Sequence, residues 1–400
     1  MSSPRRFLAF IVWAFSVLVA FAFLTGCGGG SSSSSNNTIV SSGNNVASIS
    51  VNAGPAGNYA NGGFASVTVC VPGTSTCQTV DDVLVDTGSS GLRILSSAFS
   101  LALPPQEASG NPVFECFPFE SGYTWGPVQT ADVEIADEKA SSVPVQLVGT
   151  NTPVPDGCLD FGLPSSNTLD TLGANGILGV GLFAQDCGQY CEELQTAPGN
   201  PNLYYQCASS PCQAIGESLA QQVPNPVTLF ATDNNGVIIE LPAVSGGEPS
   251  LSGSLVFGIG TESNNALGGA TIYTADSSGS FTTTYSGSAY SGSFIDSGSN
   301  GFFFPDTNGI TECGSDESGF YCPSTTENLS ASNQGVNGSS GTVKFSVADA
   351  ATLFDSNDYV FNDLGGPASN YFDWGLPFFY GRNVFTGIQG ATYPNGYWAY

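Results

Sequence analysis

The chain of 400 residues contains no histidine, one methionine and only six lysine and arginine residues in total. Without histidine, neither a Ser-His-Asp nor a Cys-His hydrolase site can form, and a nucleophilic serine would need an unusual base. The few basic residues stand against 33 acidic ones, which gives a formal net charge of −27. Such a chain repels nucleic acid and anionic membrane surfaces, and no basic patch predicts a nucleic-acid partner.

Residues that favour isolated helices are also scarce. Only 10% of the residues are charged, whereas the chain contains 51 glycines and 27 phenylalanines. This composition lacks the Glu, Lys, Arg and Leu richness of helical proteins and predicts strands and turns. The length fits two or three domains, and 41% hydrophobic residues are enough to bury a core in each of two. We therefore expect a mainly β protein with two domains.

The first residues have the pattern of an export signal rather than of a folded domain. Arg5 and Arg6 precede an apolar stretch from Phe7 to Leu24, and Cys27 follows with a run of glycine and serine. Residues 1–26 resemble a bacterial lipoprotein signal peptide. That resemblance implies cleavage before Cys27, lipidation of Cys27, a flexible linker over residues 27–44, and anchoring at the cell envelope, on the outer membrane. The alternative is a retained membrane helix, since the stretch is at the short end of what can span a bilayer.

Cysteine counting agrees with an exported protein. Of the 11 cysteines, ten remain beside Cys27, an even number suited to disulfides in an oxidising compartment. Six of the ten cysteines form three pairs that are close in sequence, and these pairs predict loop disulfides. The spacing of the other four cysteines does not determine which of them pair. The expected disulfides are Cys70–Cys77, Cys207–Cys212, Cys313–Cys322, Cys187–Cys191 and Cys116–Cys158. A metal cluster is the competing interpretation for the cysteines between 187 and 212, but without histidine we expect neither metal nor cofactor.

Two similar aspartate motifs carry most of the functional information. The first reads Val-Leu-Val-Asp-Thr-Gly-Ser-Ser and contains Asp86; the second reads Gly-Ser-Phe-Ile-Asp-Ser-Gly-Ser and contains Asp296. An apolar strand followed by Asp-Thr/Ser-Gly places a carboxylate on a tight turn, where glycine permits a close approach and hydroxyls can bind the acid. Two such turns facing each other would make a carboxylate pair that shares one proton, with one acid and one base at the same pH. Two unrelated turns are the alternative.

With these motifs, the chain resembles the two-lobed, pepsin-like aspartic peptidases. The segment Gly176-Ile-Leu-Gly179 matches the apolar segment that passes beside the first catalytic turn in that family, and Trp374-Gly375 opens a similar segment in the second half. The resemblance spans most of residues 45–400. It implies a bilobal fold of two related β-barrel-like lobes with a cleft between them. We expect an N-terminal lobe over residues 45–235 and a C-terminal lobe over residues 236–400.

The resemblance also implies the chemistry and its residues. Asp86 and Asp296 would activate a water that attacks a peptide carbonyl, without metal or cofactor. The neighbouring turn residues would hold the two carboxylates, and a hairpin over the cleft would close on the substrate. The supporting residues are Thr87, Gly88, Ser89, Ser297, Gly298 and Ser299, and the hairpin and substrate residues are Phe119, Gly122, Tyr123 and Arg93. A pair that holds one proton favours work at acidic pH, although the acidic composition fits solubility alone equally well.

Three positions depart from the family pattern. Arg93 stands where these enzymes usually have tryptophan, and Phe119 stands where they have a tyrosine of the hairpin, which removes a hydroxyl. Tyr123 or Trp125 would be substitutes for it, and Arg93 is expected to pair with Glu120. Asp373 precedes Trp374 where the family has an apolar residue; because burying a further charge is costly, we expect it to face solvent.

Two functional classes remain open from the sequence. The first is a membrane-anchored, monomeric aspartic endopeptidase that cleaves extended polypeptides at acidic pH. The second uses the same scaffold without hydrolysis, as a surface-binding or envelope lipoprotein. The two complete Asp-Thr/Ser-Gly motifs favour the enzyme, whereas the altered hairpin residues favour the binding protein.

Overall fold

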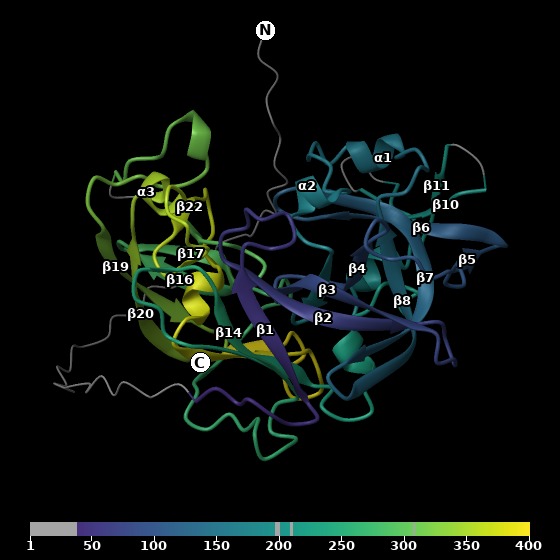
Figure 1. The fold of residues 1–400 in the computed structure, drawn as a ribbon, viewed down its shortest axis with the longest axis horizontal. Coiled ribbons are helices and arrows are strands. Elements are labelled where there is room, and N and C mark those ends of the chain that lie inside the picture. Colours follow the sequence, from purple (N-terminus) through teal and green to yellow (C-terminus); the bar gives the residue numbers. More distant parts are fainter. Residues whose placement is uncertain (1–37, 197–200, 209–210, 307–308) are drawn as a thin grey trace, which may run out of the picture. The chain divides into compact units, whose positions relative to one another are not determined.

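The computed structural model describes residues 38–196, 201–208, 211–306 and 309–400, which belong to one compact unit. The predicted signal peptide, Cys27 and most of the linker lie outside the described residues. Within the described part of the chain, no helix has the length and apolar character needed to cross a membrane. As the composition predicts, the fold is mainly β (Figure 1).

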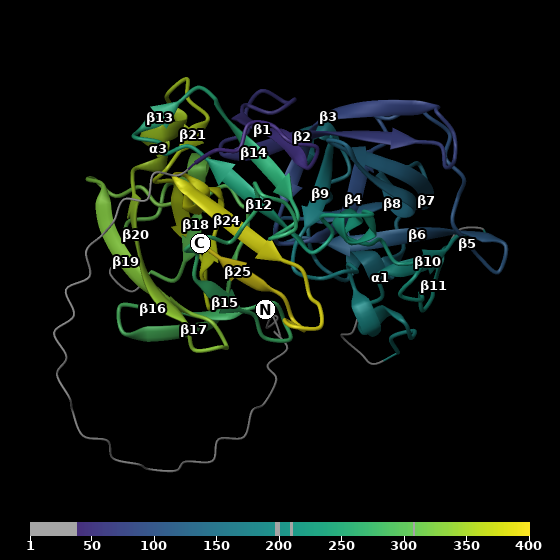
Figure 2. The same ribbon diagram turned by 90° about the horizontal axis from the view of Figure 1, so that it is seen from below.

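The largest sheet contains 16 strands and includes both halves of the chain. Figure 2 shows its early strands beside the late strands β24 and β25. In pairing order the path is β11 (Gln213–Ala214), β10 (Tyr204–Gln206), β6 (Asn111–Pro118), β7 (Tyr123–Ile135), β8 (Glu138–Val148), β4 (Ser90–Leu95), β9 (Gly176–Val180), β3 (Cys77–Asp86), β2 (Gly62–Cys70), β1 (Val46–Asn52), β14 (Leu251–Phe257), β12 (Gly236–Leu241), β24 (Arg382–Gly387), β25 (Tyr397–Ala399) and β15 (Ile272–Thr274), with β5 (Glu107–Ala108) beside β6. Because strands from both sides of residue 235 share this sheet, the boundary at residues 235 and 236 stays a prediction.

A second sheet has seven strands from the later part of the chain. Its order is β20 (Ser340–Val347), β19 (Glu327–Gln334), β16 (Phe281–Tyr285), β17 (Ser288–Ile295), β23 (Asp373–Trp374), β18 (Phe302–Phe304) and β22 (Gly365–Pro367), while β13 (Gly247–Glu248) pairs with β21 (Val360–Phe361). The helices are one turn or little more: α1 (Asp156–Leu159), α2 (Leu169–Leu172), α3 (Ala350–Phe354), and the 3-10 turns η1 (Gly188–Cys191), η2 (Pro226–Leu229), η3 (Ser315–Glu317) and η4 (Leu376–Phe379).

The central strands are buried on both faces, which explains their continuous apolar sequence. In β9 every residue is buried, and the last four residues of β3 are buried as well. These two strands run parallel, as expected for strands covered on both sides. The same main core contains Trp374, Phe372 and Phe304, whose rings stack in the later sheet. The first aspartate motif therefore begins inside a packed core, and in the second motif Ile295, just before Asp296, reaches the same core.

Five disulfides fasten the surrounding loops, and they join the same cysteines that the sequence analysis paired. The pairs are Cys70–Cys77, Cys116–Cys158, Cys187–Cys191, Cys207–Cys212 and Cys313–Cys322. Four of them close loops of nine residues or fewer, whereas Cys116–Cys158 spans 42 residues and ties β6 to α1. All ten cysteines of the described residues are thus used, which leaves none of them for a metal.

Candidate active site

Asp86 and Asp296 occupy equivalent positions at the ends of two strands, each of which ends on a buried apolar residue before the acid. Asp86 is the last residue of β3 and is paired in parallel with Gly179 of β9. Asp296 follows the last residue of β17, which is paired in parallel with Trp374 of β23, and its backbone N–H donates to the Trp374 carbonyl at 3.1 Å. In each case a glycine of the neighbouring segment leaves room for the turn. A Cβ on Gly179 would lie 2.7 Å from the carbonyl carbon of Ser90, and a Cβ on Gly375 would lie 2.7 Å from the backbone carbonyl oxygen of Ser299.

The two turns bind each other directly through their second residues. The Thr87 N–H donates to Ser297 Oγ at 3.1 Å, and the Ser297 N–H donates to Thr87 Oγ1 at 2.9 Å. Each hydroxyl then donates to a carbonyl of the opposite strand, Thr87 to Ile295 at 3.2 Å and Ser297 to Val85 at 2.7 Å. Since all four groups are buried, this reciprocal set fixes the turns against each other.

The carboxylates face each other across the pair of turns. The Gly88 N–H donates to Asp86 Oδ1 at 2.8 Å and also lies 3.2 Å from Asp296 Oδ1, which accepts from the Gly298 N–H at 2.7 Å. A Cβ added to Gly88 would lie 2.6 Å from Asp296 Cγ, and one on Gly298 would lie 2.8 Å from Asp86 Oδ1. Only glycine at both positions permits the two acids to approach in this way.

Two serines complete the hydrogen bonding of the acids from outside. Ser89 Oγ donates to Asp86 Oδ2, and Ser299 Oγ donates to Asp296 Oδ2 at 3.1 Å. All the turn residues chosen from the sequence, namely Thr87, Gly88, Ser89, Ser297, Gly298 and Ser299, therefore contact the acids or the opposite turn.

The environment favours a proton on Asp296. Burial raises the pKa of Asp296 well above its usual value, and the charges of Asp86 and Asp373 raise it further. Two facing carboxylates resist double ionisation, so the pair retains one proton where an isolated aspartate has lost it. The arrangement supplies one hydrogen-bond donor and one carboxylate base within the same small space.

The expectation that Asp373 faces solvent is wrong. Asp373 is only 4% exposed, in β23 between β17 and β18. Burial raises the pKa of Asp373 well above the usual value for aspartate. The hydrogen bond with Ser299 lowers this pKa, whereas the charges of Asp86 and Glu120 raise it further. Its Oδ1 is buried and without a partner among the described residues. The cost of a buried charge is avoided here by holding the acid in its protonated form.

Two cavities flank the turns. The Tyr59 cavity, of about 120 Å³, contains both aspartates and is bounded by Tyr59, Phe119, Glu120 and Ile177. The Phe117 cavity, of about 210 Å³, begins at Gly88 and Ser89 and is bounded by Phe117, Phe183, Phe294 and Trp398. Mostly apolar walls with a few polar groups near the acids are typical of a site that binds part of an organic ligand.

The hairpin of β6 and β7 supplies aromatic rings to both cavities. Phe119 bounds the Tyr59 cavity, and its N–H donates to the Gly122 carbonyl at 2.7 Å across the hairpin tip. Gly122 is required there because a Cβ would lie 2.1 Å from Ser166 Oγ. Neither Tyr123 nor Trp125 replaces the missing hydroxyl at the cavity: both are buried in a separate cluster with Phe114 and Tyr205.

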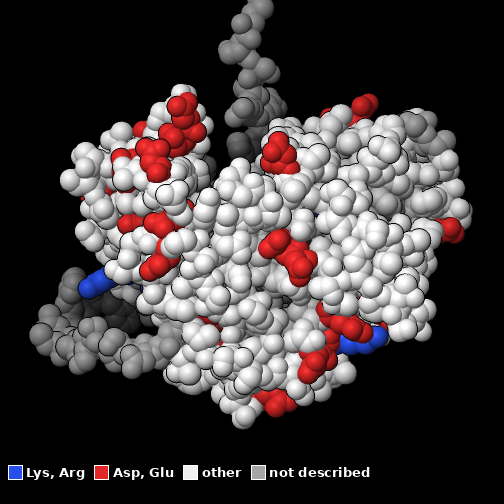
Figure 3. All heavy atoms as spheres, viewed as in Figure 1, with Lys and Arg blue, Asp and Glu red and all other residues white. Residues whose placement is uncertain are grey.

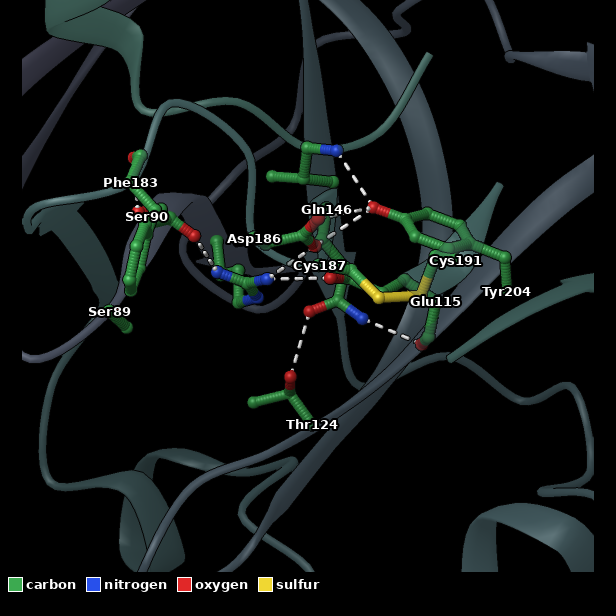
Figure 4. Close-up of polar contacts among 12 residues, drawn as sticks. Ser89, Ser90, Glu115, Thr124, Gln146, Phe183, Asp186, Cys187, Cys191 and Tyr204 are labelled. Atoms are coloured by element: carbon green, nitrogen blue, oxygen red, sulfur yellow. Dashed lines mark hydrogen bonds and ion pairs between the residues drawn. A yellow bond between two sulfur atoms is a disulfide. The ribbon is translucent and has the colours of Figure 1, made fainter. Parts of the chain in front are cut away.

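Arg93 does not pair with Glu120, contrary to the sequence-based expectation. Its guanidinium binds Glu115 at 2.5 Å and Asp186 at 3.1 Å, and both carboxylates are fully buried (Figure 4). Glu120 instead accepts a hydrogen bond from the Tyr371 hydroxyl at 2.9 Å. Three residues of the site were not identified from the sequence: Glu115 and Asp186, which bind Arg93, and Tyr59, which bounds the cavity of the two acids. A signal existed for Glu115, because a charged residue inside the buried run Val-Phe-Glu-Cys-Phe requires a buried partner.

The surface carries its acidic residues in scattered groups. In the view of Figure 3, red acidic side chains are separated by broad uncharged areas, and blue side chains appear at only two places. One of the few basic residues, Lys139, lies 2.9 Å from Glu134 and 3.6 Å from Asp132. This distribution agrees with a solubilising surface, and the described residues of this face show no cluster of basic side chains.

Comparison with known proteins places the chain in a family without assigning an activity. No curated protein matches the chain. A family model described as "Protein of unknown function (DUF3443)" matches residues 41–400, and this range includes both aspartate turns, the hairpin and Asp373. The chain therefore belongs to the DUF3443 family.

Proposed function

We propose that the protein is an aspartic endopeptidase of the two-lobed, pepsin-like kind, which hydrolyses peptide bonds in extended polypeptides. The observation that carries the proposal is the contact between the two Asp-Thr/Ser-Gly turns, which are far apart in the chain but bind each other through Thr87 and Ser297. The resulting carboxylate pair lines the Tyr59 cavity, and the neighbouring Gly88 and Ser89 line the Phe117 cavity. That placement suits a chain of substrate passing over the acids.

The proposed reaction uses the two carboxyl groups in opposite roles. Asp86, as the carboxylate, removes a proton from a water whose oxygen forms a bond to the peptide carbonyl carbon. Asp296, as the protonated acid, donates its proton to the carbonyl oxygen. The tetrahedral diol then collapses: Asp86 gives the proton that it took from water to the nitrogen, the C–N bond breaks, and ionised Asp296 takes a proton from one hydroxyl of the diol as the carbonyl re-forms. Both acids return to their starting states, and a carboxylic acid and an amine are released. The raised pKa of Asp296 supports its role as the proton donor.

Burial and fixed hydrogen bonds reduce the reorganisation that this reaction needs. The N–H groups of Gly88 and Gly298 hold the inner oxygens, while Ser89 and Ser299 hold the outer ones. Each acid therefore keeps its orientation when its charge changes, which is the requirement for preorganised acid–base catalysis.

We also propose that the enzyme works while anchored to the cell envelope through a lipid on Cys27, as a monomer. Export is supported by the five disulfides, which persist in oxidising compartments. Cys27→Ala should release the protein from the membrane fraction, whereas unchanged fractionation would favour a retained membrane helix.

A second candidate is a binding protein of the envelope that no longer cleaves peptides. It is favoured by one specific observation: the hairpin residue over the acids, Phe119, has no hydroxyl, and neither Tyr123 nor Trp125 supplies one. The same cavities would then hold a polypeptide segment without hydrolysis.

One experiment separates the two candidates. The purified protein in detergent is incubated with an unfolded protein from pH 2 to pH 8, with and without a statine-type inhibitor. The peptidase proposal expects inhibitor-sensitive fragments, their loss in Asp296→Asn, and their retention in Asp137→Asn, which changes an exposed acid. Binding of the unfolded chain without fragments at any pH would favour the binding protein. Full activity in Asp296→Asn would place the chemistry elsewhere.

A further inference from the structure

Arg93 lies at the centre of a fully buried polar group that the proposed reaction does not use. We name it the Arg93 cluster; it contains Arg93, Glu115, Asp186 and Tyr204 (Figure 4). Tyr204 donates its hydroxyl to Asp186 at 2.8 Å and accepts the Val223 N–H at 2.8 Å. The cluster therefore joins four separate elements: β4 with Arg93, β6 with Glu115, the segment after β9 with Asp186, and β10 with Tyr204.

The cluster is arranged so that its charges cancel. Burial raises the pKa of Asp186 well above its usual value, and the charge and hydrogen bond of Glu115 raise it further, whereas Arg93 lowers it. A protonated Asp186 leaves one guanidinium against one carboxylate. Removing Arg93 alone would leave Glu115 as an uncompensated buried charge, which is strongly destabilising.

The contacts of Arg93 connect the hairpin to the turn that bears Asp86. Its Nη1 donates to the Ser90 carbonyl at 2.8 Å, four residues after Asp86, and its Nη2 donates to Glu115 on the hairpin strand β6. The Ser90 hydroxyl in turn donates to the Phe183 carbonyl at 2.6 Å. One planar side chain thus spans the distance from the catalytic turn to the base of the hairpin.

The guanidinium also supports two rings of the hairpin. It lies 3.8 Å from the centre of the Phe117 ring and 5.7 Å from that of Phe119. Phe117 bounds one of the two cavities beside the acids, and Phe119 bounds the other. The two rings contact each other with centres 5.0 Å apart. A movement of Arg93 would therefore shift the walls of both cavities together.

We propose that Arg93 is a positioning residue, which holds the hairpin tip of residues 117–123 at a fixed place above the two aspartates. The effect of this role on catalysis rests on the proposed function, whereas its effect on the hairpin does not. Lysine cannot perform the role, because it lacks the planar fork that reaches Ser90, Glu115 and Asp186 at once and the flat face that stacks on Phe117.

The test uses Arg93→Lys, with Arg382→Lys as the matched control. Arg382 also donates to a backbone carbonyl, that of Phe378 at 2.5 Å, and stacks 4.6 Å from the ring centre of the same residue. For Arg93→Lys we expect amide hydrogen exchange of residues 119–123 to accelerate about tenfold, with exchange in β3 and β17 unchanged. We expect KM for a cleaved peptide to rise about tenfold, while the pH dependence of kcat stays that of the wild type. Arg382→Lys should leave both the hairpin exchange and KM unchanged.

A second variant separates positioning from simple loss of stability. Arg93→Met together with Glu115→Gln removes the cation and one of its two acids at once, and burial raises the pKa of Asp186, the acid that remains. This double variant should fold and still show rapid exchange at residues 119–123. Wild-type protection of the hairpin in the double variant, or equal acceleration throughout the protein in Arg93→Lys, would overturn the proposal. If the wild type cleaves no peptide, the proposed function fails, but the exchange data still decide the role of Arg93.

Discussion

Asp373→Asn should increase stability at neutral pH while it leaves stability at low pH unchanged. The substitution keeps the size of the side chain and an N–H that can donate to Ser299 Oγ in place of the carboxyl proton, but it removes the ability to ionise. Asp373 is 4% exposed, and burial raises its pKa well above the usual value. At neutral pH the unfolded chain releases this proton freely, whereas the folded protein retains it or holds a buried charge.

The sign of the effect follows from proton uptake. Between the ordinary pKa of aspartate, near 4, and the raised pKa of the folded state, the folded protein binds more protons than the unfolded chain, so rising pH favours unfolding. The contribution of Asp373 to the free energy of unfolding is fully present below about pH 4. As the pH rises, this contribution is lost at about 1.4 kcal/mol per pH unit, until the pH passes the raised pKa. The difference in free energy of unfolding between Asp373→Asn and the wild type should therefore increase with pH at the same rate per pH unit.

Urea unfolding at pH 3, 4, 5, 6 and 7 measures this difference directly. Asp137→Asn, at an exposed turn, serves as the control and should give a free energy of unfolding parallel to that of the wild type at every pH. If Asp373→Asn and the wild type also gave parallel curves, the buried, protonated state of Asp373 would be wrong. Because Asp373→Asn cannot ionise, it also removes, at pH values above the raised pKa of Asp373, a charge that raises the pKa of Asp296, so the alkaline limit of peptide cleavage should move to lower pH.

Further predictions concern the turns and the disulfides. Gly298→Ala should reduce cleavage at least about 100-fold, since its Cβ would lie 2.8 Å from Asp86 Oδ1, whereas Gly314→Ala, with no atom within 4 Å, should be silent in the same peptide assay. Thr87→Val and Ser297→Ala should each lower the free energy of unfolding by about 1–3 kcal/mol, and a double-mutant cycle should give a coupling of at least about 0.5 kcal/mol; additive effects would contradict their reciprocal bonding. Replacing Cys116 and Cys158 by alanine should cost about 4 kcal/mol for the loop of 42 residues, against about 2 kcal/mol for Cys187 and Cys191, as calorimetry would measure.

Local features of the site could be predicted from the sequence because they depend on a few neighbouring residues. An apolar strand, a carboxylate, a hydroxyl and a glycine define the turn at Asp86 and the turn at Asp296, and the structure has both strands and both sets of hydrogen bonds. Short cysteine spacings such as that of Cys70 and Cys77 limit the possible partners in the same way. The contact between the two turns depends on tertiary packing, and only the resemblance to a family suggested it.

The partner of Arg93 was predicted wrongly, and strand geometry explains the error. Side chains two residues apart lie on the same face of a strand, so Glu115 and Phe117 share a face, and Phe119 continues that face just beyond β6. Arg93 contacts all three. Glu120 lies at the hairpin tip beyond β6, is exposed and accepts a hydrogen bond from Tyr371, so nearness in the sequence to Phe119 did not place it near Arg93. Alternation along the strand would have identified Glu115.

The polar groups around the two acids are unequal, and this inequality supports one order of proton transfer. On the Asp296 side, buried Asp373 adds a further acid, and both Asp86 and Asp373 raise the pKa of Asp296. On the Asp86 side, Arg93 donates to the Ser90 carbonyl four residues further along the chain, but Glu115 and Asp186 bind the same guanidinium and offset its charge. A negative neighbour favours the protonated form of an acid, whereas a cation favours the ionised form. The proposed reaction therefore assigns the shared proton to Asp296, whose pKa is raised by burial and by both neighbouring acids.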